Sequence, residues 1–73
     1  MTATSAAAVI EYRDGRPPVA VVAAGDDAVA LRAFATTACE PGRSKFTARV
    51  AGGGLWQFDI DHTDVAAVRL VTS

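Results

Sequence analysis

The chain has 73 residues, of which 51% are hydrophobic and 21% are charged, and its formal net charge is −1 at pH 7. A chain of this length forms one domain at most, expected to span residues 1–73, and its large aliphatic side chains are too frequent for a disordered protein. Because basic residues are not in excess, charge alone does not favour binding to nucleic acid or to a membrane surface.

The chain is expected to begin with a loose tail, residues 1–5, followed by a hairpin. Apolar and polar side chains alternate over residues 8–13, and residues 19–24 are apolar and rich in valine, so both segments predict strands. Between them Pro17 and Pro18 cannot donate a backbone N–H to a ladder, which argues against a tight two-residue turn. We expect a longer loop that runs through both prolines.

A helix is predicted after Gly25, with Asp26 as its N-cap and two carboxylates near the positive end of the helix dipole. The apolar residues that follow have the 3.6-residue period of a helix with one buried face, namely Ala28, Leu31, Phe34, Ala35 and Ala38. The helix is expected to end before Pro41. Cys39 lies on the flank of the apolar face and is expected to be a small, partly buried thiol.

The second predicted hairpin consists of residues 45–50 and 55–61, in which the even-numbered residues are mostly apolar. A loop made of the three glycines 52–54 predicts a register in which Val50–Trp56, Ala48–Phe58 and Phe46–Ile60 pair on the apolar face. The opposite face then pairs Arg49 with Gln57, Thr47 with Asp59, and Lys45 with Asp61. In this register Trp56 and Phe58 lie beneath the helix and are not free to stack on nucleobases.

The last segment is expected to form a helical turn over residues 64–66 and then a strand to about Thr72, although Asp64 could equally begin a short helix. We expect the strand beside residues 55–61, with Val68 near Phe58 and Leu70 near Trp56. The order β-β-α-β-β-β predicts a two-layer α+β fold with a twisted, mostly antiparallel sheet of four to five strands and one helix on one face. The same order is similar to the β-grasp topology, in which the first and fourth strands pair in parallel at the sheet centre.

Few residues in the chain could carry chemistry. The acidic cluster Asp59–Asp64 lacks the spacing of an EF-hand and has too few histidines and cysteines for zinc, so a metal site or small enzyme there is the least favoured interpretation. Cys39 and His62 could pair as nucleophile and base, but no local sequence signature brings them together. We therefore expect no enzyme, no cofactor and no metal.

The favoured function is a small protein-binding module, such as an adaptor, an inhibitor or an antitoxin- or phage-type regulator, that self-associates as a homodimer. The strand over residues 19–24 is apolar on both faces, so its outward side chains predict a contact patch. The residues expected at the partner surface are Val9, Ala20 and Val22, with Glu11 and Arg13 as the charged margin. A core this small also favours extra burial by association.

The alternative function is a nucleic-acid-binding regulator that uses the basic residues of the open sheet face, namely Arg43, Lys45, Arg49 and Arg69. Asp59 and Asp61 lie among these residues and make the face mixed in sign, which counts against it. As for location, Cys39 is the single cysteine and no apolar run approaches the ~18–20 residues of a membrane span, so we expect a cytoplasmic protein without membrane association.

Overall fold

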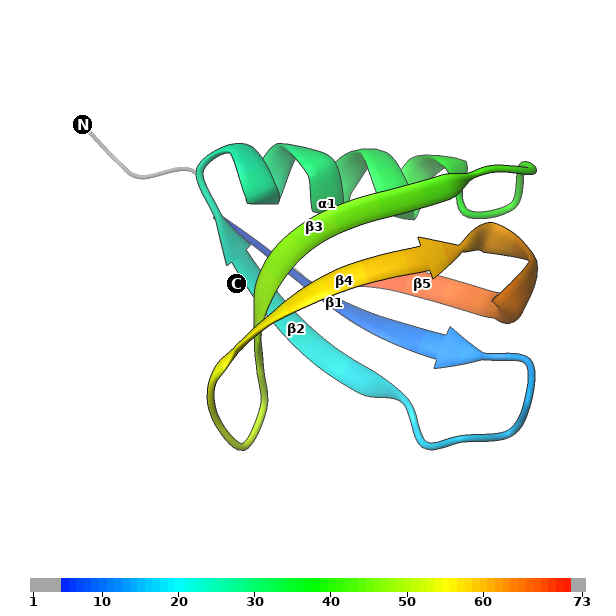
Figure 1. The fold of residues 1–73 in the computed structure, drawn as a ribbon, viewed down its shortest axis with the longest axis horizontal. Coiled ribbons are helices and arrows are strands. Elements are labelled where there is room, and N and C mark those ends of the chain that lie inside the picture. Colours follow the sequence, from blue (N-terminus) through cyan, green and yellow to red (C-terminus); the bar gives the residue numbers. More distant parts are fainter. Residues whose placement is uncertain (1–4, 72–73) are drawn as a thin grey trace.

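The structure is a computed structural model that describes residues 5–71, and in it the alternating segments of the chain form strands on which one helix packs (Figure 1). The sheet is antiparallel, with the strand order β4-β3-β2-β1-β5. This confirms the predicted α+β fold. Since β1 and β4 are not neighbours, the β-grasp arrangement is wrong. The elements in chain order are β1 (Ser5–Tyr12), β2 (Val19–Ala24), α1 (Asp26–Thr37), β3 (Arg43–Val50), β4 (Leu55–Asp61), the 3₁₀ turn η1 (His62–Asp64) and β5 (Val65–Val71).

The hydrophobic core lies between α1 and one face of the sheet. Leu31 and Phe34 of the helix are completely buried, as the 3.6-residue period predicts. The ring of Phe34 packs against Phe46 of β3, with 5.6 Å between the ring centroids. The sheet contributes alternate residues of its strands to this core, among them Ala6, Ala8, Ile10, Val21, Ala23, Ala48, Ile60 and Val65.

The first hairpin differs from its prediction at both ends of its first strand, which spans Ser5–Tyr12 instead of residues 8–13. Ser5 pairs with Ala24 and so does not belong to the expected tail, whose other residues, 1–4, lie outside the described ones. The hairpin loop runs from Arg13 to Pro18 and includes both prolines, as expected. Pro18 comes directly before β2, where its missing N–H interrupts no ladder.

The helix begins one residue earlier than expected. Gly25 is the N-cap, with a φ of 63°, and no side chain caps the first turn, so the expectation for Asp26 is wrong. The glycine conformation lets the chain turn directly from β2 into α1, and the Gly25 carbonyl accepts from Ala28 and Val29. The carboxylate of the next residue, Asp27, does not cap the helix but accepts a hydrogen bond from the backbone N–H of Thr47 (3.1 Å). This bond ties the beginning of the helix to β3.

The β3–β4 hairpin is shifted by two residues from the predicted register. Phe46 pairs with Phe58, and Ala48 pairs with Trp56. The reason lies in the turn, which uses Ala51, Gly52 and Gly53 rather than the three glycines: Gly53 donates to the carbonyl of Val50, and Gly52 has a φ of 100°. Type II turns require such a positive φ at their third residue. A shift of two keeps every side chain on its predicted face, because strands have a period of two.

Strand β5 lies at the opposite edge of the sheet from the predicted one. It pairs with β1, so that Val68 is opposite Ile10 and Leu70 is opposite Ala8, and neither lies beside Phe58 or Trp56. The η1 turn carries the chain from β4 across to the free edge of β1, where the N–H of Arg13 donates to the carbonyl of Asp64 (3.0 Å). Thr72, the expected end of this strand, lies outside the described residues.

The shortest pairing in the sheet is between β2 and β3, whose register contains only the pairs Val21–Val50 and Val22–Arg49. The two hairpins therefore diverge, and their loops lie at opposite ends of the lower side of the molecule in Figure 1. The helix packs mainly on β1, β2, β3 and β5. Strand β4 consequently extends beyond the area that the helix covers.

Candidate functional site

The open face of the sheet, on the side away from α1, collects the apolar residues predicted to bind a partner. Val9 of β1 pairs with Ala20 of β2, and Val22 pairs with Ala7. Cross-strand partners point to the same face, and Val21 and Ala23 are buried toward the helix. The structure therefore places Val9, Ala20 and Val22 together on the open face.

The strand register places two further apolar residues in the same row of the open face, one on each edge strand, with Arg49 within the row. A row of neighbouring positions runs from β4 to β5 through Leu55, Arg49, Val22, Ala7 and Val71. Leu55, Val22 and Val71 are 66%, 52% and 50% exposed. We call the six apolar residues the open-face patch: Ala7, Val9, Ala20, Val22, Leu55 and Val71. Sequence reasoning missed Leu55 and Val71, because their places depend on the register of β4 and on the edge that β5 occupies.

The predicted charged margin of the patch is only partly free. Glu11 lies on the open face and forms an ion pair with Arg69 of β5, with 3.3 Å between Oε2 and Nε. Arg13 has a structural task, because its Nε donates to the carbonyl of Val65 (3.0 Å). Together with the backbone bond to Asp64, this contact holds the end of β1 against the start of β5.

The four basic residues of the alternative prediction also share the open face. Each of them pairs with an open-face residue of a neighbouring strand and therefore points to the open face. The four are Arg43, Lys45, Arg49 and Arg69. Arg43 forms an ion pair with Asp59 (3.2 Å), and Arg69 pairs with Glu11. Lys45 is directly opposite Asp59 in the ladder. The acids therefore offset much of the positive charge that a phosphate backbone would meet.

The expectation that Trp56 lies in the core is wrong. Trp56 is 61% exposed, although its side chain is on the same face of the sheet as the helix. In the part of the chain that the structure describes, the helix packs mainly on the four other strands and leaves this end of β4 uncovered. Phe58 is half-buried and stacks on Phe46, with 5.2 Å between centroids. The sequence argument against base stacking therefore does not hold for Trp56.

The buried His62 joins three elements of the fold. Its Nδ1 lies 2.9 Å from the carbonyl oxygen of Glu40, and its Nε2 lies 2.7 Å from the Ser44 hydroxyl. Both ring nitrogens are thus engaged, and neither faces Cys39. The thiol of Cys39 is exposed, which corrects the expectation of a partly buried side chain.

The acidic turn after β4 is organised by local hydrogen bonds. The Asp61 carboxylate accepts from the backbone N–H and the hydroxyl of Thr63, both at 2.9 Å. These bonds lower the pKa of Asp61, since they favour its charged form. Within residues 5–71, no three His, Cys, Asp or Glu side chains are grouped so that they could hold a metal ion.

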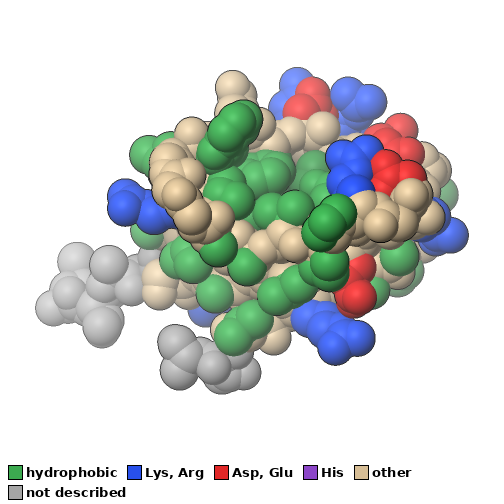
Figure 2. All heavy atoms as spheres, turned by 90° about the horizontal axis from the view of Figure 1, so that it is seen from below, with side chains coloured by type: hydrophobic (Ala, Val, Ile, Leu, Met, Phe, Trp, Pro, Cys, Tyr) green, Lys and Arg blue, Asp and Glu red, His purple; other side chains and the backbone are tan. Residues whose placement is uncertain are grey.

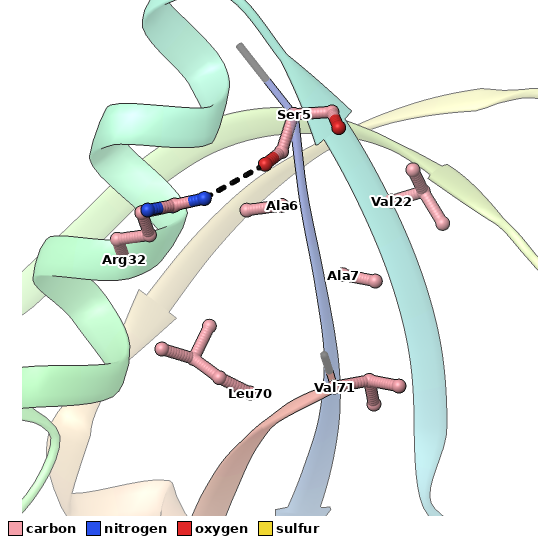
Figure 3. Close-up of a pocket in the computed structure, with 7 residues that line it drawn as sticks. All are labelled: Ser5, Ala6, Ala7, Val22, Arg32, Leu70 and Val71. Carbon is pink, nitrogen blue, oxygen red and sulfur yellow. Dashed lines mark hydrogen bonds between the residues drawn. The ribbon is translucent and has the colours of Figure 1, made fainter. Parts of the chain in front are cut away.

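A pocket of about 570 Å³ lies where the start of β1, the end of β5 and α1 meet (Figure 3). Arg32 of the helix donates to the carbonyl of Ser5 across it (3.0 Å). Figure 3 shows Leu70 and Ala6 on the helix side of β1, and Ala7, Val22 and Val71 on the opposite side. The open-face patch thus borders this pocket at one edge of the sheet.

No protein-family model, curated protein or solved structure matches this chain. Within the described residues, α1 is too short and too polar to cross a membrane, and no other helix qualifies.

Proposed function

We propose that the protein is a small protein-binding module that self-associates through the open-face patch. The observation that carries this proposal is the exposed apolar surface of the open face, where Val22 and Val71 are each at least half exposed and are joined through Ala7. Leu55 lies in the same row, separated from Val22 by Arg49. Exposed apolar surface of this kind is a feature of protein contact sites. A second copy would remove it from water, which also supplements a core that is small for an independent domain.

The arrangement suits a symmetric contact between two copies. In an isologous interface the same patch serves both partners, so an apolar centre meets an apolar centre. The paired charges Glu11 and Arg69 lie at its side, where they remain in contact with water. As an adaptor or regulator, the module would also bind another protein. That protein would use the same patch and replace the second copy.

The mass of the protein in solution tests this proposal. Val22→Asp places a charge at the centre of the patch, beside Arg49 of β3, and we expect it to weaken the dimer by at least about ten-fold in dissociation constant, because dimerisation would have to desolvate this charge against the apolar side chains of the second copy. Val29→Asp is the matched control, since Val29 is 61% exposed on the helix and far from the open face. Sedimentation equilibrium over a concentration series measures both variants.

The expected result is a monomeric Val22→Asp variant, a dimeric Val29→Asp variant, and folded circular dichroism spectra for both. A wild-type protein that is monomeric at every concentration would refute self-association. A Val22→Asp variant that keeps the mass of the wild type would show that the open-face patch is not the interface.

Binding to nucleic acid is the second candidate, and the exposure of Trp56 favours it, because an accessible indole can stack on an unpaired base. The basic residues on the other face would then contact phosphates. A gel shift with single-stranded DNA or RNA at low salt tests this function. Binding through phosphate contacts must weaken as the salt concentration rises. Trp56→Ala must weaken binding further, because it removes the stacking surface.

A further inference from the structure

A groove of about 310 Å³ lies along β4, on the part of the sheet that the helix leaves open. It runs between the edge of β4 and the end of the first hairpin, where Tyr12 and Arg16 form the opposite wall. Trp56 and Phe58 supply aromatic surface from β4. Seen from the side of the two hairpin loops, hydrophobic side chains gather in a hollow that charged side chains border (Figure 2).

The backbone of β4 is available for pairing along this groove. The N–H of Val50 donates to the carbonyl of Gly54, and hydrogen-bonded pairs alternate with non-bonded pairs in an antiparallel ladder. The N–H and C=O groups of Leu55, Gln57 and Asp59 therefore point away from β3. The strand contains no proline or bulge, two devices that protect an edge from a further strand, and its charged residues Asp59 and Asp61 would repel an acidic strand but attract a cationic one.

The opposite edge of the sheet is better protected. The ladder of β5 with β1 is irregular between Glu11 and Tyr12. Such an irregularity twists the edge and interrupts pairing. The contrast identifies β4 as the edge to which an extended chain can add.

The charges of the groove indicate what kind of chain fits. Its acidic side chains are Asp59, Asp61 and Asp64, and its basic side chain is Arg16. Arg16 is already held by Asp14, and its guanidinium lies 4.6 Å from the centre of the Tyr12 ring. Arg43 pairs with Asp59, which leaves Asp61 and Asp64 as the main attraction for an incoming cation.

We propose that β4 and its groove bind an extended segment of another protein that carries Lys or Arg side chains, which adds to the sheet as a further strand. The backbone of the segment pairs with the free edge of β4. Its cationic side chains lie on the face of the carboxylates Asp59 and Asp61, and the alternate side chains on the other face pack against Trp56 and Phe58. A second copy of β4 fits less well, since it would bring its own Asp59 and Asp61 into an acidic groove. This site is separate from the open-face patch and does not depend on it.

The test uses ¹⁵N-labelled protein and a capped nine-residue peptide in which Lys and Val alternate. We expect the peptide to shift the amide signals of Leu55, Gln57 and Asp59 in particular, and a peptide with Glu in place of Lys to bind at least about ten-fold more weakly. Methylating every second peptide amide must abolish binding in one of the two possible patterns, because only alternate N–H groups reach β4.

A pair of protein variants provides the complementary evidence. Gln57→Pro removes one outward N–H without removing a hydrogen bond to β3, and we expect at least about ten-fold weaker peptide binding. Gln57→Thr keeps that N–H and should bind like the wild type. The amide spectrum in the absence of peptide shows whether each variant is folded, and the methylated peptides test the same contact on the unchanged protein.

Three results would overturn the proposal. The first is equal binding of the Lys and Glu peptides, or no shift of the amide signals up to about 5 mM peptide, which would place the dissociation constant above that concentration. The second is a set of shifts confined to the open-face patch. The third is a dimer that Gln57→Pro disrupts and Val22→Asp does not, which would make a second copy the occupant of the β4 edge.

Discussion

Removing the ring of Phe34 should destabilise the protein more than any other single truncation in the helix. Phe34 is completely buried and packs between Phe46 and His62, with centroid distances of 5.6 and 5.5 Å. Truncation of a buried phenylalanine to alanine costs about 3–5 kcal/mol of unfolding free energy. The two ring contacts place Phe34→Ala in the upper part of that range, at about 4–5 kcal/mol, since each aromatic pair adds roughly 0.5–1.5 kcal/mol beyond area burial.

This loss is large relative to the stability of a chain of this size. Domains typically unfold at about 0.05–0.15 kcal/mol per residue, or roughly 4–11 kcal/mol for this chain. An unfolding entropy of about 0.15 kcal/mol per kelvin converts a loss of about 4–5 kcal/mol into a fall in Tm of roughly 27–33 °C. Phe34→Leu, which retains most of the apolar volume, should lose only about 1–2 kcal/mol and keeps the experiment measurable if the alanine variant does not fold.

Urea unfolding followed by far-ultraviolet circular dichroism measures these differences. Fluorescence is the poorer probe, because Trp56 is largely exposed in the folded state. Val29→Ala on the exposed side of the same helix is the control and should change the unfolding free energy by no more than about 0.5 kcal/mol. A loss below about 1 kcal/mol for Phe34→Ala would refute the described packing of the helix on the sheet.

Three further predictions concern the loops and the end of the helix. Gly42→Ala should lower the unfolding free energy by about 1–3 kcal/mol, because Gly42 has a φ of 152° and a methyl group there would lie 3.4 Å from Nδ1 of His62. A thermal melt measures the loss, and an unchanged Tm would contradict this prediction. The hydrogen bonds from Thr63 lower the pKa of Asp61, so they stabilise the fold above the unfolded pKa of about 4 and lose this effect as the pH falls through the lowered value. Asp61→Asn should therefore lose less stability than the wild type between about pH 5 and pH 2, and parallel acid-unfolding curves would count against this. Cys39 is exposed and should react with a thiol reagent at a similar rate in native buffer and in urea, whereas strong protection in native buffer would show that the thiol is buried.

The sequence pattern predicts which face of the sheet each side chain occupies better than it predicts where each strand lies. Phe46, Ala48 and Ile60 are buried as expected, although the register is shifted by two, because a shift of two preserves the alternation. The 3.6-residue period likewise identifies Leu31 and Phe34 as the buried face of the helix.

The position of each strand in the sheet depends on information that local patterns do not contain. An alternating strand such as β5 can pair at either free edge, and contacts between distant parts of the chain, such as the bonds of Arg13 to Asp64 and Val65, favour the edge of β1. The exposure of Trp56 likewise depends on how far the helix extends over the sheet. The patch residues Leu55 and Val71 could not be predicted for the same reason.

The pairing between β2 and β3 is the shortest in the sheet, so few backbone hydrogen bonds join β1, β2 and β5 to β3 and β4. The helix packs across this boundary, on β1 and β2 on one side and on β3 on the other. Leu31 and Phe34 of the helix are completely buried in the shared core, so their side chains help to hold the two groups of strands together. A cavity left by truncating either residue would therefore weaken the join between the two hairpins as well as the core itself.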